Sequence, residues 1–146
     1  YGEGQRDHVK SLLRWSLISC VVLEAVTLLV VWGFTDNLIA IFNSENNQQL
    51  LSYAHVGLRI YFLGFLFAGI NIMLVAYFSA VDRAVPAITG SLMRGIIAIA
   101  VSAVILSRLF GINGVWSSFL SSEIITFVVL LVLAKAGEKR GLKNEI

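Results

Sequence analysis

The sequence predicts an all-α membrane protein, a polytopic bundle of four transmembrane helices. Four apolar stretches fill most of the chain, and each is long enough to cross a bilayer: residues 12–34, 50–81, 85–109 and 115–134. A bilayer core of about 30 Å needs about 20 apolar residues in a helix, because a helix satisfies its own backbone hydrogen bonds where there is no water. The composition agrees, since 58% of the residues are hydrophobic and only 14% are charged, whereas soluble domains average about 25% charged residues.

The distribution of basic residues predicts the orientation of the helices. Residues 35–49 contain no Lys or Arg, and the turn after the third helix contains only Arg108. Eight of the eleven basic residues lie elsewhere outside the apolar stretches or at their edges: Arg6, Lys10, Arg14, Arg83, Lys135, Lys139, Arg140 and Lys143. By the positive-inside rule, we expect a cytoplasmic loop over residues 1–11 and a cytoplasmic tail over residues 135–146.

The chain opens with a polar segment that leads into the first helix. Residues 1–11 begin with Tyr1 and lack the pattern of a signal peptide, so we expect them to be an internal loop. Residues 12–34 follow as the first transmembrane helix, with Trp15 near its inner end and Trp32 near its outer end. Indole rings favour the headgroup level of a membrane because they are partly apolar and partly polar. The two tryptophans therefore support these bounds.

An external loop over residues 35–49 connects the first two helices. Within it, residues 38–42 are apolar but too short to cross the membrane, so we expect them to lie along the outer surface. A polar cluster ends the loop, and Asn46 or Asn47 is expected to cap the N-terminus of the second helix, residues 50–81.

The last two helices are separated by glycines. Pro86 suits the first turn of the third helix, residues 85–109, because proline lacks the N–H that the first turn leaves unpaired. Gly111 and Gly114 are expected to break the apolar run before the fourth helix, residues 115–134.

Small residues recur on one side of the last three helices. They are Gly57, Gly64, Ala68 and Asn71, then Ser91, Gly95, Ala98 and Ser102, then Gly114, Ser118 and Ser122. Helices in lipid associate through close backbone approach, which small residues permit. The pattern therefore predicts a compact bundle.

Four ionisable residues lie deep within the predicted membrane segments: Glu24, Arg59, Arg94 and Glu123. An isolated charge there costs about 2.5–3.5 kcal/mol even on the mildest scale, so the two acids and two bases are expected to pair. Depth along the helix axes predicts a pair of Arg59 with Glu123 and a pair of Arg94 with Glu24. Such a pair either belongs to a functional site or only fixes the helix register, and the sequence leaves both possibilities open.

Several classes of site are not expected. The single Cys20 excludes a disulfide within the chain, and His8 and His55 lack the spacing of metal ligands, so no metal is predicted. The serines of residues 117–122 have no histidine partner in reach. We therefore assign no catalytic residue and expect neither an enzyme nor a nucleic-acid partner.

Several short segments match one family of transporters. They are Ile41-Phe42, Gly57-Leu58-Arg59-Ile60-Tyr61, Tyr77-Phe78-Ser79-Ala80, Ser91-Leu92-Met93-Arg94, Leu109-Phe110-Gly111-Ile112-Asn113-Gly114-Val115-Trp116 and Ser122-Glu123. Through them the chain resembles the C-terminal part of multidrug and toxic compound extrusion (MATE) transporters. The segment that begins Tyr1-Gly2-Glu3-Gly4-Gln5 resembles the loop after their eighth helix.

The resemblance implies that the four helices are helices nine to twelve of a twelve-helix fold, in which two lobes surround a central cavity. Such transporters expel amphipathic, often cationic compounds in exchange for protons or sodium ions. The implied partners are therefore small amphipathic or cationic substrates, the lipid bilayer and the remaining helices of the same transporter. The coupling ion would be H⁺ or Na⁺, with no other cofactor, and the location would be the cell membrane.

The resemblance also implies roles for the intramembrane charges. Glu24 and Glu123 are candidates for supplying negative charge to the substrate or ion pathway. Arg59 and Arg94 are candidates for holding these acids in place. Some members use an acid in the tenth helix, but its counterpart here has no Asp or Glu.

Polar and aromatic residues of the second helix complete the candidate set. Asn71 is expected to make an interhelical hydrogen bond or a polar contact with substrate, and Tyr61 is a further pathway candidate. Phe62, Phe65 and Phe67 either line a drug pocket or contact lipid and neighbouring helices.

Two alternative functions remain open. A flippase of lipid-linked oligosaccharides in the same superfamily would use arginines to face pyrophosphate, and Arg59 and Arg94 are compatible with that role. A small four-helix scaffold subunit is the other alternative, against which the start at Tyr1 argues.

Overall fold

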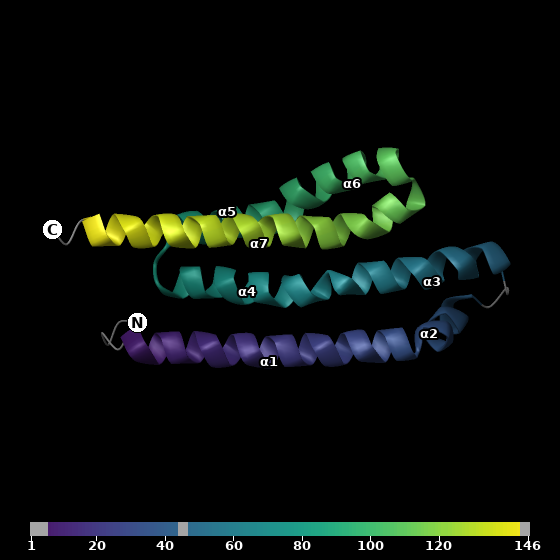
Figure 1. Ribbon diagram of the computed structural model, residues 1–146, viewed down its shortest axis with the longest axis horizontal. Coiled ribbons are helices and arrows are strands. Elements are labelled where there is room, and N and C mark those ends of the chain that lie inside the picture. The colour runs from purple at the N-terminus through teal and green to yellow at the C-terminus, as the bar shows by residue number, and fades with distance from the viewer. Residues whose placement is uncertain (1–5, 44–46, 144–146) are drawn as a thin grey trace.

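The structure is a computed structural model that describes residues 6–43 and 47–143. Within those residues it is helical and contains no strand (Figure 1). The elements are α1 (Arg6–Gly33), α2 (Thr35–Phe42), α3 (Gln48–Leu63), α4 (Phe65–Ala80), α5 (Ala84–Leu92), the π-helix η1 (Met93–Ile97), α6 (Ala98–Phe110) and α7 (Ile112–Lys143).

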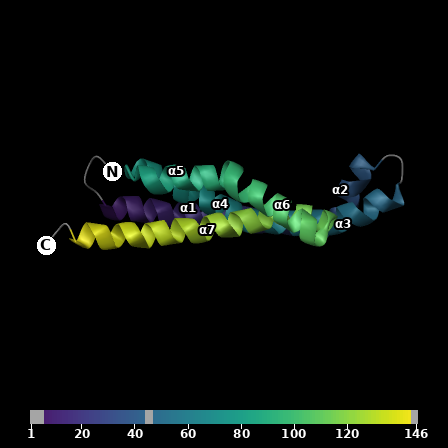
Figure 2. The ribbon, with the colours of Figure 1, turned by 90° about the horizontal axis from the view of Figure 1, so that it is seen from above.

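Four helical runs are long and apolar enough to cross a membrane: His8–Gly33, Gln48–Ala80, Ala84–Phe110 and Ile112–Gly137. The predicted all-α fold with four transmembrane helices is therefore confirmed. The runs alternate in direction, and the start of α1 and the end of α7 lie at the same end of the bundle (Figures 1 and 2).

The first and last helices are longer than the apolar stretches that predicted them. Helix α1 begins at Arg6 rather than near residue 12, and α7 continues to Lys143, beyond Ala134. Lys, Arg and Glu are good helix formers, so charged turns can extend a helix outside the apolar region. Much of the expected loop over residues 1–11 and of the tail over residues 135–146 is thus helical, while residues 1–5 and 144–146 lie outside the described residues.

The connection between the first two spans contains the short helix α2, which includes the apolar residues 38–42. Asn47 caps α3 as predicted, since its side-chain oxygen accepts hydrogen bonds from the amides of Gln49 at 2.9 Å and Leu50 at 3.1 Å. Asn46, the alternative cap, lies outside the described residues. The Asn43 side chain stabilises the same turn, because its Oδ1 accepts a hydrogen bond from the Asn47 amide at 2.9 Å.

Two predicted helices are interrupted. The helix predicted over residues 50–81 breaks between α3 and α4 at Gly64, whose amide donates to the carbonyl of Tyr61 at 3.0 Å. The helix predicted over residues 85–109 contains η1, and α6 leaves the direction of α5 there (Figure 1). A π-helix accommodates an extra residue per turn and so rotates the side chains that follow it. Hydropathy alone does not show such an insertion.

Glycines allow the helices to approach closely. A Cβ at Gly57 would overlap the indole of Trp116, and one at Gly114 would overlap the backbone carbonyl of Leu106. The helix-breaking role expected of Gly114 is wrong, because this residue lies inside α7; the turn is made at Gly111, which has a φ of 58°. Part of the small-residue pattern is thus confirmed as a packing feature.

Replacement of Gly114 by alanine is expected to destabilise the protein, because the added methyl group would collide with the Leu106 carbonyl. Overpacking of this kind costs about 1–3 kcal/mol. The matched control is Gly33→Ala, since a Cβ at Gly33 meets nothing within 4 Å. Thermal unfolding in detergent measures both variants, and equal melting temperatures would contradict the close contact of α6 with α7.

Candidate functional site

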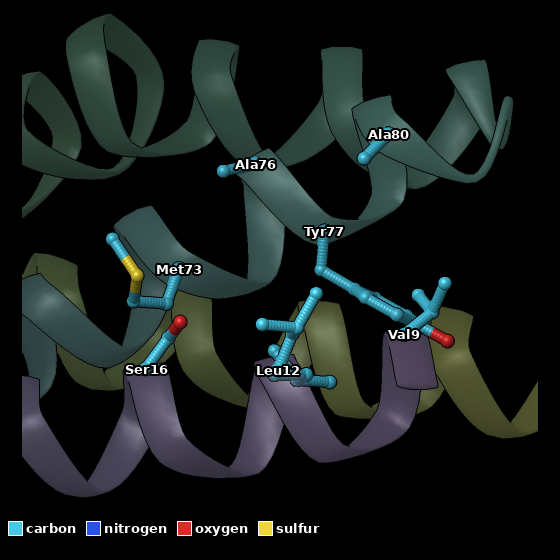
Figure 3. Close-up of a pocket in the computed structure, with 8 residues that line it drawn as sticks. Val9, Leu12, Ser16, Met73, Ala76, Tyr77 and Ala80 are labelled. Atoms are coloured by element: carbon cyan, nitrogen blue, oxygen red, sulfur yellow. The ribbon is translucent and has the colours of Figure 1, made fainter. Parts of the chain in front are cut away.

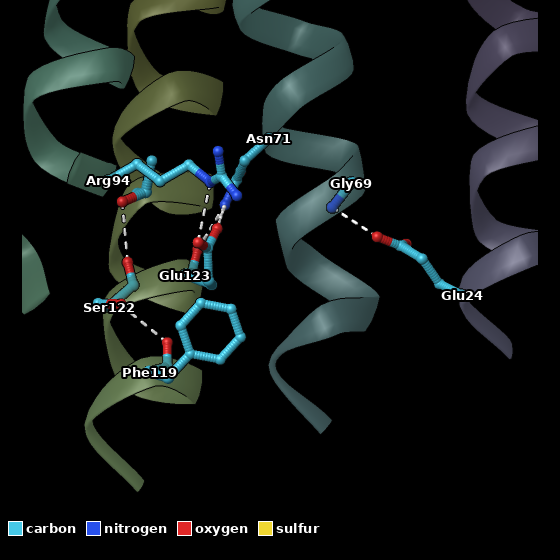
Figure 4. Close-up of polar contacts among 8 residues, drawn as sticks. Glu24, Gly69, Asn71, Arg94, Phe119, Ser122 and Glu123 are labelled. Carbon is cyan, nitrogen blue, oxygen red and sulfur yellow. Dashed lines mark hydrogen bonds and ion pairs between the residues drawn. The ribbon is translucent and has the colours of Figure 1, made fainter. Parts of the chain in front are cut away.

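Three polar side chains from separate spans meet inside the bundle. Arg94 lies on η1, Glu123 on α7 and Asn71 on α4 (Figure 4). The Arg94 Nε donates to Glu123 Oε1 at 2.9 Å, and the Asn71 Nδ2 donates to Glu123 Oε2 at 2.8 Å. The same amide nitrogen also donates to the Glu123 backbone carbonyl at 2.9 Å. Both carboxylate oxygens of Glu123 are therefore hydrogen-bonded.

Glu123 and Asn71 of this cluster are buried at the middle of the membrane spans, while Arg94 is half-buried. Glu123 is 1% exposed and Asn71 is 0% exposed. Arg94 lies ten residues after Ala84, where its span begins, which is about 15 Å along the helix axis. A charged pair at this depth is stable only when its charges are matched, and here one guanidinium pairs with one carboxylate whose two oxygens are both hydrogen-bonded.

The π-helix positions Arg94. Residues 93–97 form η1 within an otherwise α-helical span, so the register of the side chains changes at this point. Gly95, the next residue, leaves room around the turn, because a Cβ there would meet nothing within 4 Å. Local π-helices often occur at functional sites because they redirect a side chain that an α-helix would point elsewhere.

Glu24 lies on the opposite side of α4 from this cluster (Figure 4). Its Oε1 accepts a hydrogen bond from the backbone amide of Gly69 at 2.5 Å. Its other oxygen, Oε2, is buried and has no hydrogen-bond partner within the described part of the chain. Gly69 makes this approach possible, since a Cβ there would overlap the Glu24 carboxylate and the sulfur of Cys20.

The two predicted ion pairs are wrong. Glu123 pairs with Arg94 and not with Arg59, and the partner of Glu24 is a backbone amide and not Arg94. Arg59 is exposed on α3, and no acid among the described residues pairs with it. Depth along a helix axis gives the level of a side chain but not the direction in which it points, and η1 changes that direction for Arg94.

The other candidates of the second span have separate environments. Asn71 makes the predicted interhelical hydrogen bond, while Tyr61 stacks on Phe119 with ring centroids 4.5 Å apart. The phenylalanines contact other rings. Phe62 stacks on Phe65 at 4.8 Å and Phe67 packs on Phe127 at 5.8 Å. These aromatic contacts join α3 and α4 to α7.

Sequence reasoning missed Gly69, although it is the residue that receives Glu24. The available signal was a glycine inside an apolar helix, which often marks a close approach by another group. The partner could not be identified in the same way, because a backbone amide has no sequence signature.

An apolar groove runs between α1 and α4 (Figure 3). It has a volume of about 340 Å³, and its polar atoms come from Ser16 and Tyr77 among the residues Val9, Leu12, Leu13, Ser16, Met73, Ala76, Tyr77 and Ala80. A second groove shares Leu12, Ser16 and Met73 with it and extends to Cys20. Cys20 lies one helical turn before Glu24 on α1, and Glu24 itself lines neither groove.

The family model MatE matches residues 1–104. The multidrug export protein MepA of Staphylococcus saprophyticus is 24% identical over 129 residues, which cover 88% of this chain and 28% of that protein. The chain thus spans less than a third of the length of this relative. No solved structure matches the chain.

A double-mutant cycle tests the buried ion pair. Arg94→Ala is expected to lower the free energy of unfolding by about 3–5 kcal/mol, because it leaves the buried Glu123 carboxylate without its cation. Glu123→Ala is expected to cost less, because the Arg94 side chain that it leaves unpaired is 32% exposed. The double variant is expected to lose less than the sum, with an interaction energy of about 0.5–3 kcal/mol. Unfolding in mixed detergent micelles provides the measurement.

The control cycle pairs Arg59→Ala with Glu123→Ala. Additive losses are expected here, because the structure does not pair these side chains. Additivity in the Arg94 cycle together with coupling in the Arg59 cycle would contradict the observed arrangement.

Proposed function

The chain belongs to the MatE family, and from this premise we propose that it forms part of a secondary active transporter that exports amphipathic or cationic compounds. The chain is an integral membrane protein with four candidate spans, and its relative is a multidrug export protein of which it covers 28%. These facts support a fragment of a larger helical transporter. We assign the four spans to helices nine to twelve of a twelve-helix fold.

The orientation in this proposal follows from the charge distribution. Arg83, the turn between α4 and α5, and the basic end of α7 would face the cytoplasm, because basic residues are retained there. Both ends of the described chain lie on the same side of the bundle, which is consistent with that orientation (Figure 1).

The observation that carries the proposed mechanism is the contrast between the two intramembrane acids. Arg94 neutralises Glu123, whereas Glu24 has no cationic partner among the described residues and keeps one buried oxygen unpaired. Glu24 lies nine residues before Gly33, about 14 Å along the axis of α1. An acid at this depth without a cation is suited to bind the coupling ion, either H⁺ or Na⁺, whereas Glu123 would be structural.

The grooves beside α1 supply the second element of the mechanism. Their lining is mostly apolar, and the negative charge of Glu24 lies one helical turn beyond Cys20. An amphipathic cation could place its apolar body there and its charge near the carboxylate. Binding of the coupling ion to Glu24 would then compete with the substrate cation, as antiport requires. The activity is transport and involves no covalent chemistry.

Efflux of a fluorescent cation from cells that produce the full-length protein tests this function. Glu24→Gln is expected to slow ethidium efflux by about 5- to 150-fold, the range that coupling free energies of about 1–3 kcal/mol produce. Asp36→Asn is the matched control, because Asp36 is an exposed carboxylate whose partner is His55. Collapse of the proton gradient, or removal of sodium, identifies the coupling ion.

Two outcomes would count against the proposal. Failure of the wild-type protein to export ethidium or other amphipathic cations would contradict the transport function. Efflux by Glu24→Gln at the rate of Asp36→Asn would leave transport intact but remove Glu24 from the coupling mechanism.

A further inference from the structure

A groove lies at the end of the bundle where α1 begins and α7 ends, between the α4–α5 turn and α7 (Figure 1). It has a volume of about 420 Å³, which falls within the range for small-molecule sites. The turn and the start of α5 form one wall with Asp82, Arg83 and Val85, and α7 forms the other with Leu133, Ala136 and Gly137. Residues 81–83 connect two membrane spans, so the groove lies at the level of the lipid headgroups.

The contacts of Arg83 fix its side chain at this groove. Its Nη2 donates to the Leu133 carbonyl of α7 at 3.3 Å, and its guanidinium carbon lies 5.2 Å from the centre of the Phe78 ring. Gly137 makes room for the guanidinium, since a Cβ there would overlap it. Phe78 is 2% exposed, so this aromatic partner is itself held in the core. A side chain that is already held in place loses less entropy when it binds a ligand.

Asp82 places a negative charge beside this positive charge. Its side chain is exposed and forms no ion pair with any residue that the structure describes. Arg83 follows it in the sequence but donates to the Leu133 carbonyl instead. Asp82 has a φ of 57°, a conformation that Asp and Asn adopt more readily than most residues. The turn therefore presents an acid and a base that do not neutralise each other.

The two charges of the lining select the chemistry of the ligand. Lys135 of α7 is exposed and lies outside the lining, which contains one guanidinium and one carboxylate. The headgroup of phosphatidylethanolamine matches both, because it has a phosphate for an arginine and a primary ammonium group for a carboxylate. Phosphatidylcholine lacks the N–H donors of the ammonium group, and phosphatidylglycerol lacks its positive charge.

Apolar side chains continue the lining towards the membrane. Val85 is 67% exposed in the first turn of α5, and Leu133 lines the α7 wall. A phospholipid with its headgroup in the groove would place the start of its acyl chains against such side chains. A soluble phosphate ester would leave them in water, at a cost in free energy. The lining therefore favours a lipid over a soluble compound.

We propose that this groove binds the headgroup of phosphatidylethanolamine, with the phosphate on Arg83 and the ammonium group on Asp82. The bound lipid joins the α4–α5 turn to α7. It comes from the cytoplasmic leaflet in the orientation proposed above. The site itself does not depend on the transport function, because it concerns the surrounding bilayer and not the exported compound.

Lipid binding to the purified full-length protein tests the site. Delipidated protein in detergent is titrated with phosphatidylethanolamine, and bound lipid is measured by native mass spectrometry. Asp82→Asn is expected to weaken binding by about 2- to 10-fold, the range for one net hydrogen bond, because the ammonium group loses its charged partner. The backbone should be kept, since Asn also adopts positive φ. Asp36→Asn is the matched control, because Asp36 is an exposed carboxylate at the other end of the bundle (Figure 1).

Other lipids and a second variant make the test specific. Phosphatidylglycerol and phosphatidylcholine should bind the wild-type protein more weakly than phosphatidylethanolamine, and Asp82→Asn should not weaken the binding of either. Arg83→Gln should weaken the binding of all three lipids, because each contains a phosphate. Glycerophosphoethanolamine, the headgroup without acyl chains, should not displace the lipid at equal concentration.

Three results would overturn the inference. They are equal binding of the three lipids by the wild-type protein, equal binding of phosphatidylethanolamine by Asp82→Asn and Asp36→Asn, and displacement of the lipid by an equal concentration of glycerophosphoethanolamine. The last result would assign the groove to a soluble phosphate ester. Failure of the transport function would appear separately, as absent ethidium efflux in cells.

Discussion

The ion pair of Arg94 with Glu123, completed by Asn71, is the interaction on which the rest of the bundle depends. It joins α4, η1 and α7 at the middle of the membrane. Burial of apolar side chains does not favour one helix pairing over another there, because lipid tails are equally apolar. The two charges are stable at this depth only as an ion pair. Each of these helices therefore has one register in which neither charge is left unpaired. The close contacts at Gly57 and Gly114 then allow the helices to pack tightly in that register.

The same pair determines what the remaining charges can do. Because Glu123 is fully hydrogen-bonded, Glu24 is left as the intramembrane acid with an unpaired oxygen in the described part of the chain. Arg94 pairs with Glu123 through Nε, and its half-buried side chain also lines a groove between α4, α5 and η1. Helix α4 thus lies between the Arg94–Glu123 pair and Glu24, which belongs to α1 (Figure 4).

Hydropathy predicted the four spans, and turn chemistry predicted the cap at Asn47, because these features depend on local sequence. The pairing of charges was not predictable in this way. It depends on the direction of each side chain, which η1 alters at Arg94, and on a backbone amide at Gly69 that carries no side-chain signal. Glycine illustrates the limit well, since Gly57 and Gly114 mark close contacts while Gly95 and Gly33 face open space.

Glu24, and not Glu123, is proposed as the intramembrane acid that binds an ion. Infrared difference spectroscopy of the purified full-length protein during acidification tests this assignment, because a protonated carboxyl group has a distinct C=O stretching band. We expect a band that disappears in Glu24→Gln and persists in Glu123→Gln. Persistence of the band in Glu24→Gln together with its loss in Glu123→Gln would assign ion binding to Glu123 and refute the role of Glu24.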